Sequence, residues 1–339
     1  MKSIKLGIIG CGIAATELHW PVLQKLRDKF KITAICNNTE PKAKEFSELV
    51  GGVPYVLDYR ELLQNPDVEA IIIALPIYLN NQVTKDVLSA GKHVFVEKPL
   101  AANIEEARDL LEFGQPFPQV KMVGENWYFH PVFHRVKELI AEGRIGDPYA
   151  IFWDIFQRVT LDSKYAQTKW RIEQKHKGGF ISDGGIHNIA ALRLMFGRIT
   201  AGNAFSKSIN PAIGEVDTFS LQFETKNRVH GVLNIFRSPN GVSKNQLLVL
   251  GKQGSIAVEA NKRIFVKNEQ GTDLEETFEE DTSYRSEFED FYQAIRNGKE
   301  VVSSFSKAYE DLHVLLTALD SANQFHQLGP QDYIFAHKA

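Results

Sequence analysis

The stretch Ile4-Lys5-Leu6-Gly7-Ile8-Ile9-Gly10-Cys11-Gly12-Ile13-Ala14-Ala15 decides the fold of this chain. Its first half predicts a buried strand. Its second half matches Gly-x-Gly-x-x-Ala, a turn that leads from a strand into a helix and approaches a pyrophosphate. Gly10 would form the tight turn, Gly12 would let phosphates reach the backbone, and Ala15 would let the helix pack closely. Because free N–H groups at a helix start bind anions, we predict dinucleotide contacts at Gly10, Gly12, Ile13 and Ala14.

The surroundings of this turn decide between a nucleotide site and an ordinary strand-to-helix connection. From residue 4 to about 124, short apolar runs alternate with amphipathic segments, which is typical of βαβ units and a parallel sheet buried on both faces. The later runs are Ile32 to Cys36, Ala70 to Leu75, His93 to Val96 and Val120 to Val123. The first helical period comprises Leu18, Val22, Leu23, Leu26 and Phe30. We predict an α/β fold with a doubly wound NAD(P)-binding Rossmann domain at residues 1–124.

The second part of the chain has a different texture. Its apolar runs are separated by turn residues and lie at Ala150 to Phe156, Phe219 to Phe223, Val229 to Phe236, Gln246 to Leu250 and Ile264 to Val266. Several follow one another without a helix, which predicts an open, mainly antiparallel sheet. Helical stretches at Ser283 to Asn297 and Lys307 to His326 close the chain, with Gly298 and Gly329 as stops. We expect residues 125–339 to form an α+β domain for substrate binding and oligomerisation, with last helices that can pack back on the first domain.

Composition excludes several classes of protein. The 339 residues are 43% hydrophobic and 24% charged with a formal net charge of -3, so the chain is globular and lacks the basic excess of a nucleic-acid binder. No window reaches the roughly 18 apolar residues of a membrane span. The two cysteines, Cys11 and Cys36, cannot form a disulfide framework and suit a reducing compartment. No metal-ligand spacing is present. We expect a cytoplasmic protein without metal, membrane or nucleic-acid partners.

The end of the second strand bears on the choice between NAD and NADP. An acid about 20 residues after the glycine turn normally accepts hydrogen bonds from the ribose of NAD. Here the strand ends in Asn37, Asn38 and Thr39, and Lys42 and Lys44 follow. This pattern favours NADP slightly, because no acid at the tip would repel a 2′-phosphate. The alternative is that both lysines face solvent and Asn37 bonds either ribose, so the cofactor is NADP or NAD.

Two clusters carry candidate catalytic residues. Glu97 and Lys98 follow a buried strand at the sheet edge where ligands of such domains bind. Asp183 and His187 lie four residues apart near the start of an apolar helix, so they share a face and Asp183 could orient the imidazole of His187 for acid–base chemistry. The alternatives are a surface turn at Glu97 and Lys98, and a helix-capping Asp183 beside a core histidine.

These motifs together resemble the glucose–fructose oxidoreductase, inositol dehydrogenase and rhizopine catabolism family (Gfo/Idh/MocA). The resemblance covers nearly the whole chain and keeps the order of three motifs: the glycine turn, the segment from Val96 to Ala101, and the glycine-flanked helix from Gly178 to Gly197. Weaker matches are Ile71 to Pro76 with Asn80, the strand-end Asn126, Phe133 to Gly146, and the pair Trp170 and Arg171.

The resemblance implies roles for particular residues. Lys98 would bond the reacting oxygen, Asp183 would contact substrate and histidine, and His187 would take the hydroxyl proton as hydride leaves to nicotinamide C4. The bond between Lys98 and Pro99 is usually cis in the family. The cofactor would contact Asn37, Asn38, Leu75, Pro76, Asn80, Glu97, Lys98, Asn126, Trp170 and Arg171. The substrate would contact Lys98, Asn126, Tyr128, Arg158, Asp183 and His187, and His130, Tyr165 and His176 border its pocket.

The chain departs from the family pattern in ways that leave the substrate open. Ala190 stands where many sugar dehydrogenases have an acid, and Leu75 and Asn80 replace the usual Thr and His. The segment from Arg158 to Lys177 is rich in cations, and we consider either steering of an anionic sugar or an ordinary solvated loop.

We expect an NAD(P)-dependent oxidoreductase acting on a secondary alcohol or ketone of a sugar or polyol. The alternatives are a non-catalytic dinucleotide-binding regulator and a reductase of a non-carbohydrate such as a tetrapyrrole or dihydrodiol. We also expect a homodimer or homotetramer. Its interface would be the outer face of the second sheet, provided that Phe219, Leu221, Phe223, Val232, Leu233, Ile235 and Phe236 divide between the two faces.

Overall fold

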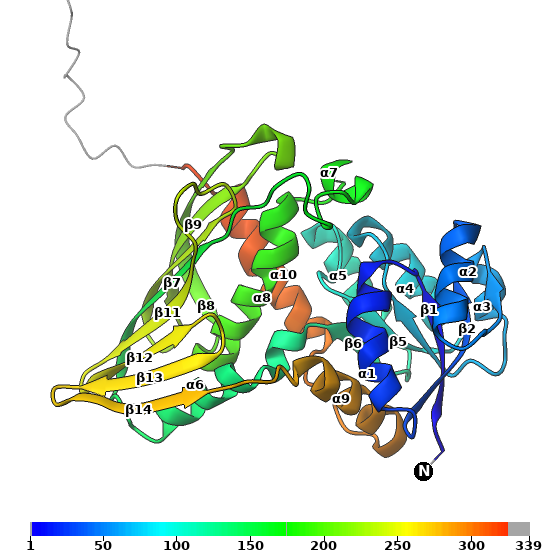
Figure 1. Cartoon of the computed structure of the whole chain (residues 1–339), viewed down its shortest axis with the longest axis horizontal. Helices are drawn as coiled ribbons and strands as arrows, with labels where there is room; N and C mark the ends of the chain where they lie inside the picture. Colours follow the sequence, from blue (N-terminus) through cyan, green and yellow to red (C-terminus); the bar gives the residue numbers. More distant parts are fainter. Residues whose placement is uncertain (1, 174, 325–339) are drawn as a thin grey trace, which may run out of the picture.

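The computed structural model describes residues 2–173 and 175–324. Figure 1 shows a large sheet forming one side of the molecule, a second α/β layer on the other side, and helices between them. None of the helices in these two ranges combines the length and apolar character that a membrane crossing requires.

The first sheet has six parallel strands in the order β3-β2-β1-β4-β5-β6. This is the doubly wound order, and its reversal between β1 and β4 creates a crevice at the carboxyl ends of those strands. The prediction of a Rossmann domain is confirmed. The strands are β1 (Ile4–Ile9), β2 (Phe30–Cys36), β3 (Tyr55–Val56), β4 (Ala70–Ile73), β5 (His93–Glu97) and β6 (Lys121–Gly124).

The helices of this layer begin with a distortion. The first turns after the glycine loop form a π-helix, η1 (Ala14–His19), which continues as α1 (Trp20–Lys25). Helix α1 ends at Lys25, so Phe30 does not belong to the helical period in which we had placed it. Phe30 begins β2 instead and packs edge-on against Phe288. The other elements are α2 (Glu40–Leu49), α3 (Tyr59–Leu63), η2 (Ile77–Leu79), α4 (Asn80–Ser89) and α5 (Ile104–Phe113).

The second sheet has eight strands in the order β14-β13-β12-β11-β7-β10-β9-β8. Only β7 and β10 pair in parallel, so the prediction of an open, mainly antiparallel sheet is confirmed. Three of its strands, β8, β12 and β14, were missed from the sequence. The strands are β7 (Pro148–Phe156), β8 (Ile199–Lys207), β9 (Thr218–Thr225), β10 (His230–Phe236), β11 (Lys244–Gly251), β12 (Gly254–Glu259), β13 (Arg263–Asn268) and β14 (Gly271–Thr277).

The inner face of this sheet carries the core of the second part. Trp153, Phe219, Phe223 and Leu233 are buried there with apolar residues of α8, and a Cβ at Gly185 would lie 2.8 Å from Ile235 Cδ1, so α8 lies close to β10. The helices are η3 (Asn126–Phe129), α6 (Pro131–Ala141), α7 (Lys169–Glu173), α8 (Gly179–Phe196), η4 (Pro211–Ile213), α9 (Ser283–Asn297) and α10 (Phe305–Asp320).

The closing helices lie between the two layers, as Figure 1 shows. Phe288 of α9 stacks on Phe95 of β5 with ring centroids 5.0 Å apart, and α9 ends at Gly298 in the left-handed conformation. Helix α10 packs against both α8 and α5. It ends at Asp320 with Ser321 as its C-cap, so the predicted continuation of this helix to His326 is wrong, and the expected stop at Gly329 lies outside the described residues.

The outer face of the second sheet is apolar for a different reason than expected. Phe219, Leu221 and Phe223 of β9 all point inward, so of the two strands in that expectation it is β10 that divides its apolar residues, with Val232 and Phe236 facing outward. Strand register aligns Val232 with apolar residues of four neighbouring strands and so makes one row across the face, consisting of Val232, Phe152, Leu248, Ala257 and Phe265.

Candidate active site

The glycine turn has room for a phosphate on one side only. Gly10 has φ of +99°, and a Cβ there would lie 2.3 Å from the carbonyl oxygen of Ala74, so only glycine fits. A Cβ at Gly12 would meet nothing within 4 Å. Among the described residues no side chain caps the start of η1 at Ile13, so its first N–H groups remain available. The residues present fit the pyrophosphate of a dinucleotide.

The end of β2 braces this turn. Asn37 accepts a hydrogen bond from the backbone N–H of Cys11 at 3.2 Å and donates to Thr39 Oγ1 at 2.7 Å. Asn38, Lys42 and Lys44 are exposed, as either interpretation of the cofactor site requires. Glu40, which we did not consider from the sequence, follows directly at the start of α2, where Tyr55 donates a hydrogen bond to it.

A buried amide fixes the turn that carries Lys98. Asn80 Nδ2 donates to the carbonyl oxygens of Glu97 and Pro99, both at 2.9 Å, and the peptide bond between Lys98 and Pro99 is cis. These bonds make Asn80 a brace of the turn. Leu75 and Pro76 follow β4 at the same edge of the sheet and are partly exposed.

Asp183 is held between two cations. Lys98 Nζ donates to its Oδ1 at 2.9 Å and to its carbonyl oxygen at 2.8 Å, and Arg171 Nε donates to its Oδ2 at 2.7 Å. The Arg171 guanidinium lies over the Trp170 ring, 4.2 Å from the centroid. Burial opposes ionisation, yet Lys98 and Arg171 hold the pKa of Asp183 well below its usual value. The structure thus joins Lys98, Arg171 and Asp183.

The partner of His187 is Glu125, which the sequence analysis missed. His187 Nδ1 lies 2.6 Å from Glu125 Oε1, and the imidazole stacks on Trp127 with centroids 5.2 Å apart. We had expected Asp183 to orient this ring, and that expectation is corrected, since its carboxylate oxygens bond the two cations instead. Glu125 is 1% exposed, whereas the His187 side chain keeps 17% exposure. The imidazole is therefore held at one nitrogen and accessible.

Two further buried groups lie in this part of the molecule. His19 is fully buried and its Nε2 lies 2.6 Å from Glu97 Oε1, which lowers the pKa of Glu97 although burial raises it. Glu287 of α9 is fully buried, and neither carboxyl oxygen has a partner among the described residues. Burial and the charges of Glu97 and Glu125 raise its pKa well above the usual value. The environment of Glu287 therefore favours its neutral form.

Of the remaining predicted residues, Tyr165 and His176 lie beside the site: the Arg171 guanidinium is 5.2 Å from the Tyr165 ring centroid, and the His176 ring is 5.5 Å from that of Trp170. Asn126, Tyr128 and Arg158 have their hydrogen-bond partners elsewhere. Asn126 is buried and donates to Ser283 Oγ at 2.8 Å. Tyr128 is buried and its hydroxyl donates to Asp311 of α10 at 2.9 Å, which gives no support for a substrate contact through that hydroxyl. Arg158 is exposed and donates to Asn240 at 2.6 Å. His130 and His176 are buried, Tyr165 is exposed, and Ala190 lies in the core.

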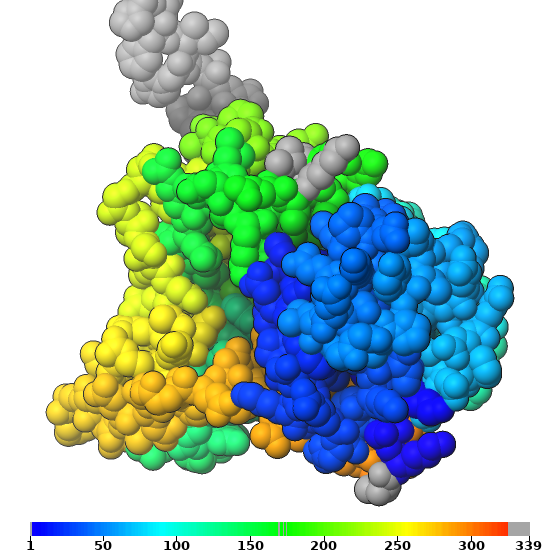
Figure 2. All heavy atoms as spheres, turned by 45° about the vertical axis from the view of Figure 1, so that its right-hand side comes forward, coloured from blue at the N-terminus to red at the C-terminus, as the bar shows by residue number. Residues whose placement is uncertain are grey.

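The cation-rich segment before α8 is largely neutralised. Lys164 pairs with Glu17, Lys175 with Glu173 and Lys177 with Asp320. Figure 2 shows this green segment lying directly on the blue atoms of the N-terminal layer. These pairs favour a docked segment over a steering field. Within the described ranges, no group of three or more His, Cys, Asp or Glu residues is arranged to hold a metal ion.

The doubly wound sheet forms a nucleotide-binding layer, and Lys98, Asp183 and His187 lie at its carboxyl edge. This combination is typical of a dinucleotide-dependent oxidoreductase. Family models agree. Residues 4–124 match the NAD-binding Rossmann fold of an oxidoreductase family, and residues 137–328 match its C-terminal alpha/beta domain. The chain belongs to the Gfo/Idh/MocA family of oxidoreductases.

Individual relatives support this assignment. A Saccharomyces cerevisiae protein without an assigned function is 30% identical over 87% of this chain and 88% of its own. The structure of an oxidoreductase from Thermotoga maritima has a TM-score of 0.90 at 36% identity, over 95% of this chain and 97% of that one. A scyllo-inositol 2-dehydrogenase (NADP(+)) from Bacillus subtilis is 28% identical over 66% of this chain and 60% of its own.

Proposed function

We propose that the protein catalyses reversible hydride transfer between a nicotinamide cofactor and a secondary alcohol or ketone of a sugar, polyol or related compound. The observation that carries the proposal is the geometry at helix α8: the accessible imidazole of His187 is held at Nδ1 by Glu125, and Asp183, one turn earlier on the same helix, binds the ammonium group of Lys98. Such a pair can bind and deprotonate a hydroxyl group. The Bacillus subtilis relative is by its name an inositol dehydrogenase, which supports the substrate class.

The chemistry divides among the residues as follows. Lys98 donates a hydrogen bond to the substrate oxygen and stabilises the negative charge that develops there. His187, with Nδ1 on Glu125, removes the hydroxyl proton through Nε2 while the carbonyl group forms. Asp183 stays ionised and fixes the Lys98 ammonium group. A dinucleotide held at the glycine turn would supply the acceptor for the hydride of the substrate carbon.

A non-catalytic, dinucleotide-binding regulator is the second candidate function, and two substitutions separate it from an enzyme. Turnover is followed as absorbance at 340 nm with NAD and NADP over cyclic polyols, aldoses, sugar acids and keto-sugars. Lys98→Met and His187→Ala should bind cofactor normally, as measured by fluorescence, and lose at least a hundredfold in kcat. Lys252→Met and His230→Ala, at exposed positions of the second sheet, are the matched controls. Tight cofactor binding without turnover on the whole panel would favour the regulator.

For the cofactor we propose NADP, with NAD as the alternative. The exposed Lys42 and Lys44 are available to a 2′-phosphate, and the asparagines at the end of β2 carry no charge that would repel it. Glu40 lies nearby and would favour NAD if it turned from Tyr55 toward a ribose. The ratio of kcat/KM for the two cofactors tests this proposal. A strong preference for NAD would contradict it.

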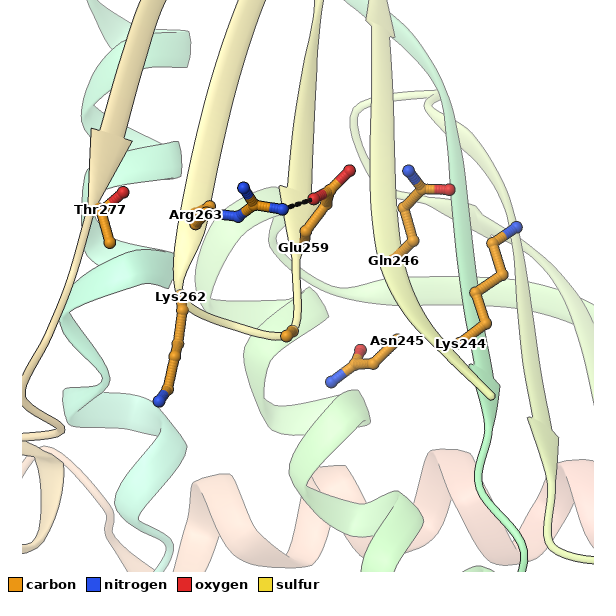
Figure 3. Close-up of a pocket in the computed structure, with 8 residues that line it drawn as sticks. Lys244, Asn245, Gln246, Glu259, Lys262, Arg263 and Thr277 are labelled. Carbon is orange, nitrogen blue, oxygen red and sulfur yellow. Dashed lines mark hydrogen bonds and ion pairs between the residues drawn. The ribbon is translucent and has the colours of Figure 1, made fainter. Parts of the chain in front are cut away.

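We also propose that two copies pair through the outer face of the second sheet. Phe152 in the apolar row is 43% exposed in the single chain, and Phe156 stacks on Phe236 beside it. Figure 3 shows the adjoining pocket of about 390 Å³, where Lys244, Arg263 and Glu259 supply charges of both signs. An apolar row flanked by mixed charge can pair with its own copy in a dimer, or in a dimer of dimers.

A further inference from the structure

Arg237 is a buried arginine beside the catalytic helix. It follows β10 directly and is 9% exposed. Its backbone N–H donates to the carbonyl oxygen of Asp217, and its own carbonyl oxygen accepts a hydrogen bond from Val159. Its side chain makes one hydrogen bond with the described residues, from Nη1 to Gln157 Oε1 at 3.0 Å. The guanidinium group therefore has donors to spare.

Helix α8 leaves a place for this guanidinium next to Asp183. A Cβ on Gly184 would lie 2.7 Å from Arg237 Nη2, so the group lies directly against the helix at the residue that follows Asp183 and one turn before His187. A side chain at position 184 would push the guanidinium away. The absence of that side chain brings a third cation to the same end of the helix as Lys98 and Arg171.

No carboxylate among the described residues forms an ion pair with Arg237. Asp183 is the acid whose charge reaches it, but the oxygens of Asp183 are already bonded to Lys98 and Arg171. The Asp217 carboxylate accepts from two backbone N–H groups and from Ser238 instead. Burial lowers the pKa of Arg237. Three cations around one carboxylate leave an excess of positive charge where water is scarce, and buried charges are stable only when they are paired.

We propose that Arg237 binds an oxyanion, a carboxylate or a phosphate, carried by the substrate, so that the enzyme acts on acidic sugars or sugar phosphates rather than on neutral polyols. This rests on the proposed hydride transfer and narrows its substrate. A guanidinium binds either oxyanion through two parallel hydrogen bonds, for which its unused donors are suited. Lys98 and His187 then handle the hydroxyl group while Arg237 fixes the charged end of the molecule.

The test uses matched probes that differ only in the charged group. Binding of D-glucose, D-glucuronate and D-glucose 6-phosphate to the cofactor-loaded full chain is measured by calorimetry, and turnover of each is followed at 340 nm. We expect at least one of the two anions to bind ten times or more tighter than glucose. Arg237→Gln should weaken that binding 10- to 100-fold and affect glucose far less, and Arg237→Lys should restore part of the loss.

Two further variants separate binding from folding. Gly184→Ala should displace the guanidinium and weaken anion binding in the same direction, without touching Arg237 itself. Arg228→Gln, at the turn between β9 and β10, removes an exposed arginine and should leave anion binding unchanged. If Arg237→Gln fails to fold, the Gly184→Ala and Arg237→Lys proteins still decide the question.

The outcomes distinguish this proposal from the proposed reaction. Anion binding that depends on Arg237, without turnover of any probe, supports the oxyanion site and contradicts hydride transfer to these sugars. If the enzyme turns over glucose in preference to the two anions, or if Arg237→Gln weakens the binding of all three probes equally, the oxyanion site is overturned and the proposed reaction stands. Absence of both binding and turnover overturns both.

Discussion

Glu125→Gln tests whether His187 depends on its buried partner. Glu125 is 1% exposed and its carboxylate lies 2.6 Å from His187 Nδ1, so in the neutral imidazole the proton lies on Nδ1 and Nε2 can accept one from the substrate. A glutamine fits the same space but can offer its NH₂ group to Nδ1. The ring would then hold its proton on Nε2 and could not act as a base.

The size of the effect follows from the hydrogen bond. A bond to a charged group contributes about 1.5–3 kcal/mol, which corresponds to roughly 10- to 150-fold in kcat when the bond is needed only in the transition state. We therefore expect kcat to fall by about that factor in Glu125→Gln, with KM and cofactor affinity changed less than threefold. Glu125→Asp, which keeps the charge at a longer distance, should recover part of the rate.

The assay combines steady-state kinetics with the ¹⁵N spectrum of the histidine side chains, which reports which ring nitrogen of His187 carries the proton. Glu138→Gln, on the exposed side of α6, is the control. A wild-type rate in Glu125→Gln, or a loss of rate with an unchanged tautomer, would refute the positioning role of Glu125.

Three other predictions concern the cofactor loop, the buried acid and the sheet face. Gly10→Ala should destabilise the protein by about 1–3 kcal/mol, because its Cβ meets Ala74. Gly12→Ala should keep the melting temperature and weaken NADPH binding. If both variants changed the melting temperature and the NADPH affinity equally, this prediction would be contradicted. Glu287 binds its proton more tightly folded than unfolded, so stability should fall as pH rises above the ordinary carboxyl pKa. Glu287→Gln should therefore gain most in melting temperature near pH 8 and least near pH 4, and a pH-independent difference would disprove the neutral state. Phe152→Glu should halve the mass measured by light scattering, and an unchanged oligomer would place the interface elsewhere.

The nucleotide layer could be predicted from the sequence because its signals are local. Strand β1 has the bounds that its apolar run predicts, and the steric contact of Gly10 with Ala74 explains why the turn needs glycine. Strand β8 could not be predicted, since Ile199–Lys207 contains glycine, asparagine and serine and is held by its pairing with β9. Its strand character comes from a neighbour and not from its own side chains.

The candidate site shows the same limit. Helical spacing puts Asp183 and His187 on one face, but spacing cannot show that Asp183 is already engaged by Lys98, a residue 85 positions away. Glu125 is 62 positions from His187, and its only signal in the sequence is an acid at the end of a buried strand. Arg237 carries no motif at all. Long-range pairings of charge are decided by the packing of the two layers, which no local pattern encodes.

The acids of the site differ in what they pair with, and this division explains how several can be buried together. Glu97 is hydrogen-bonded with His19 and Glu125 with His187, and Asp183 is paired with two cations, so each of these carboxyl groups has a polar partner. Glu287 has no hydrogen-bond partner among the described residues, and its raised pKa favours the neutral form. A uniform set of ionised acids would repel one another at this depth. The arrangement keeps the imidazole on one carboxylate and the lysine on another, so a proton can move at His187 without disturbing the charge that holds Lys98.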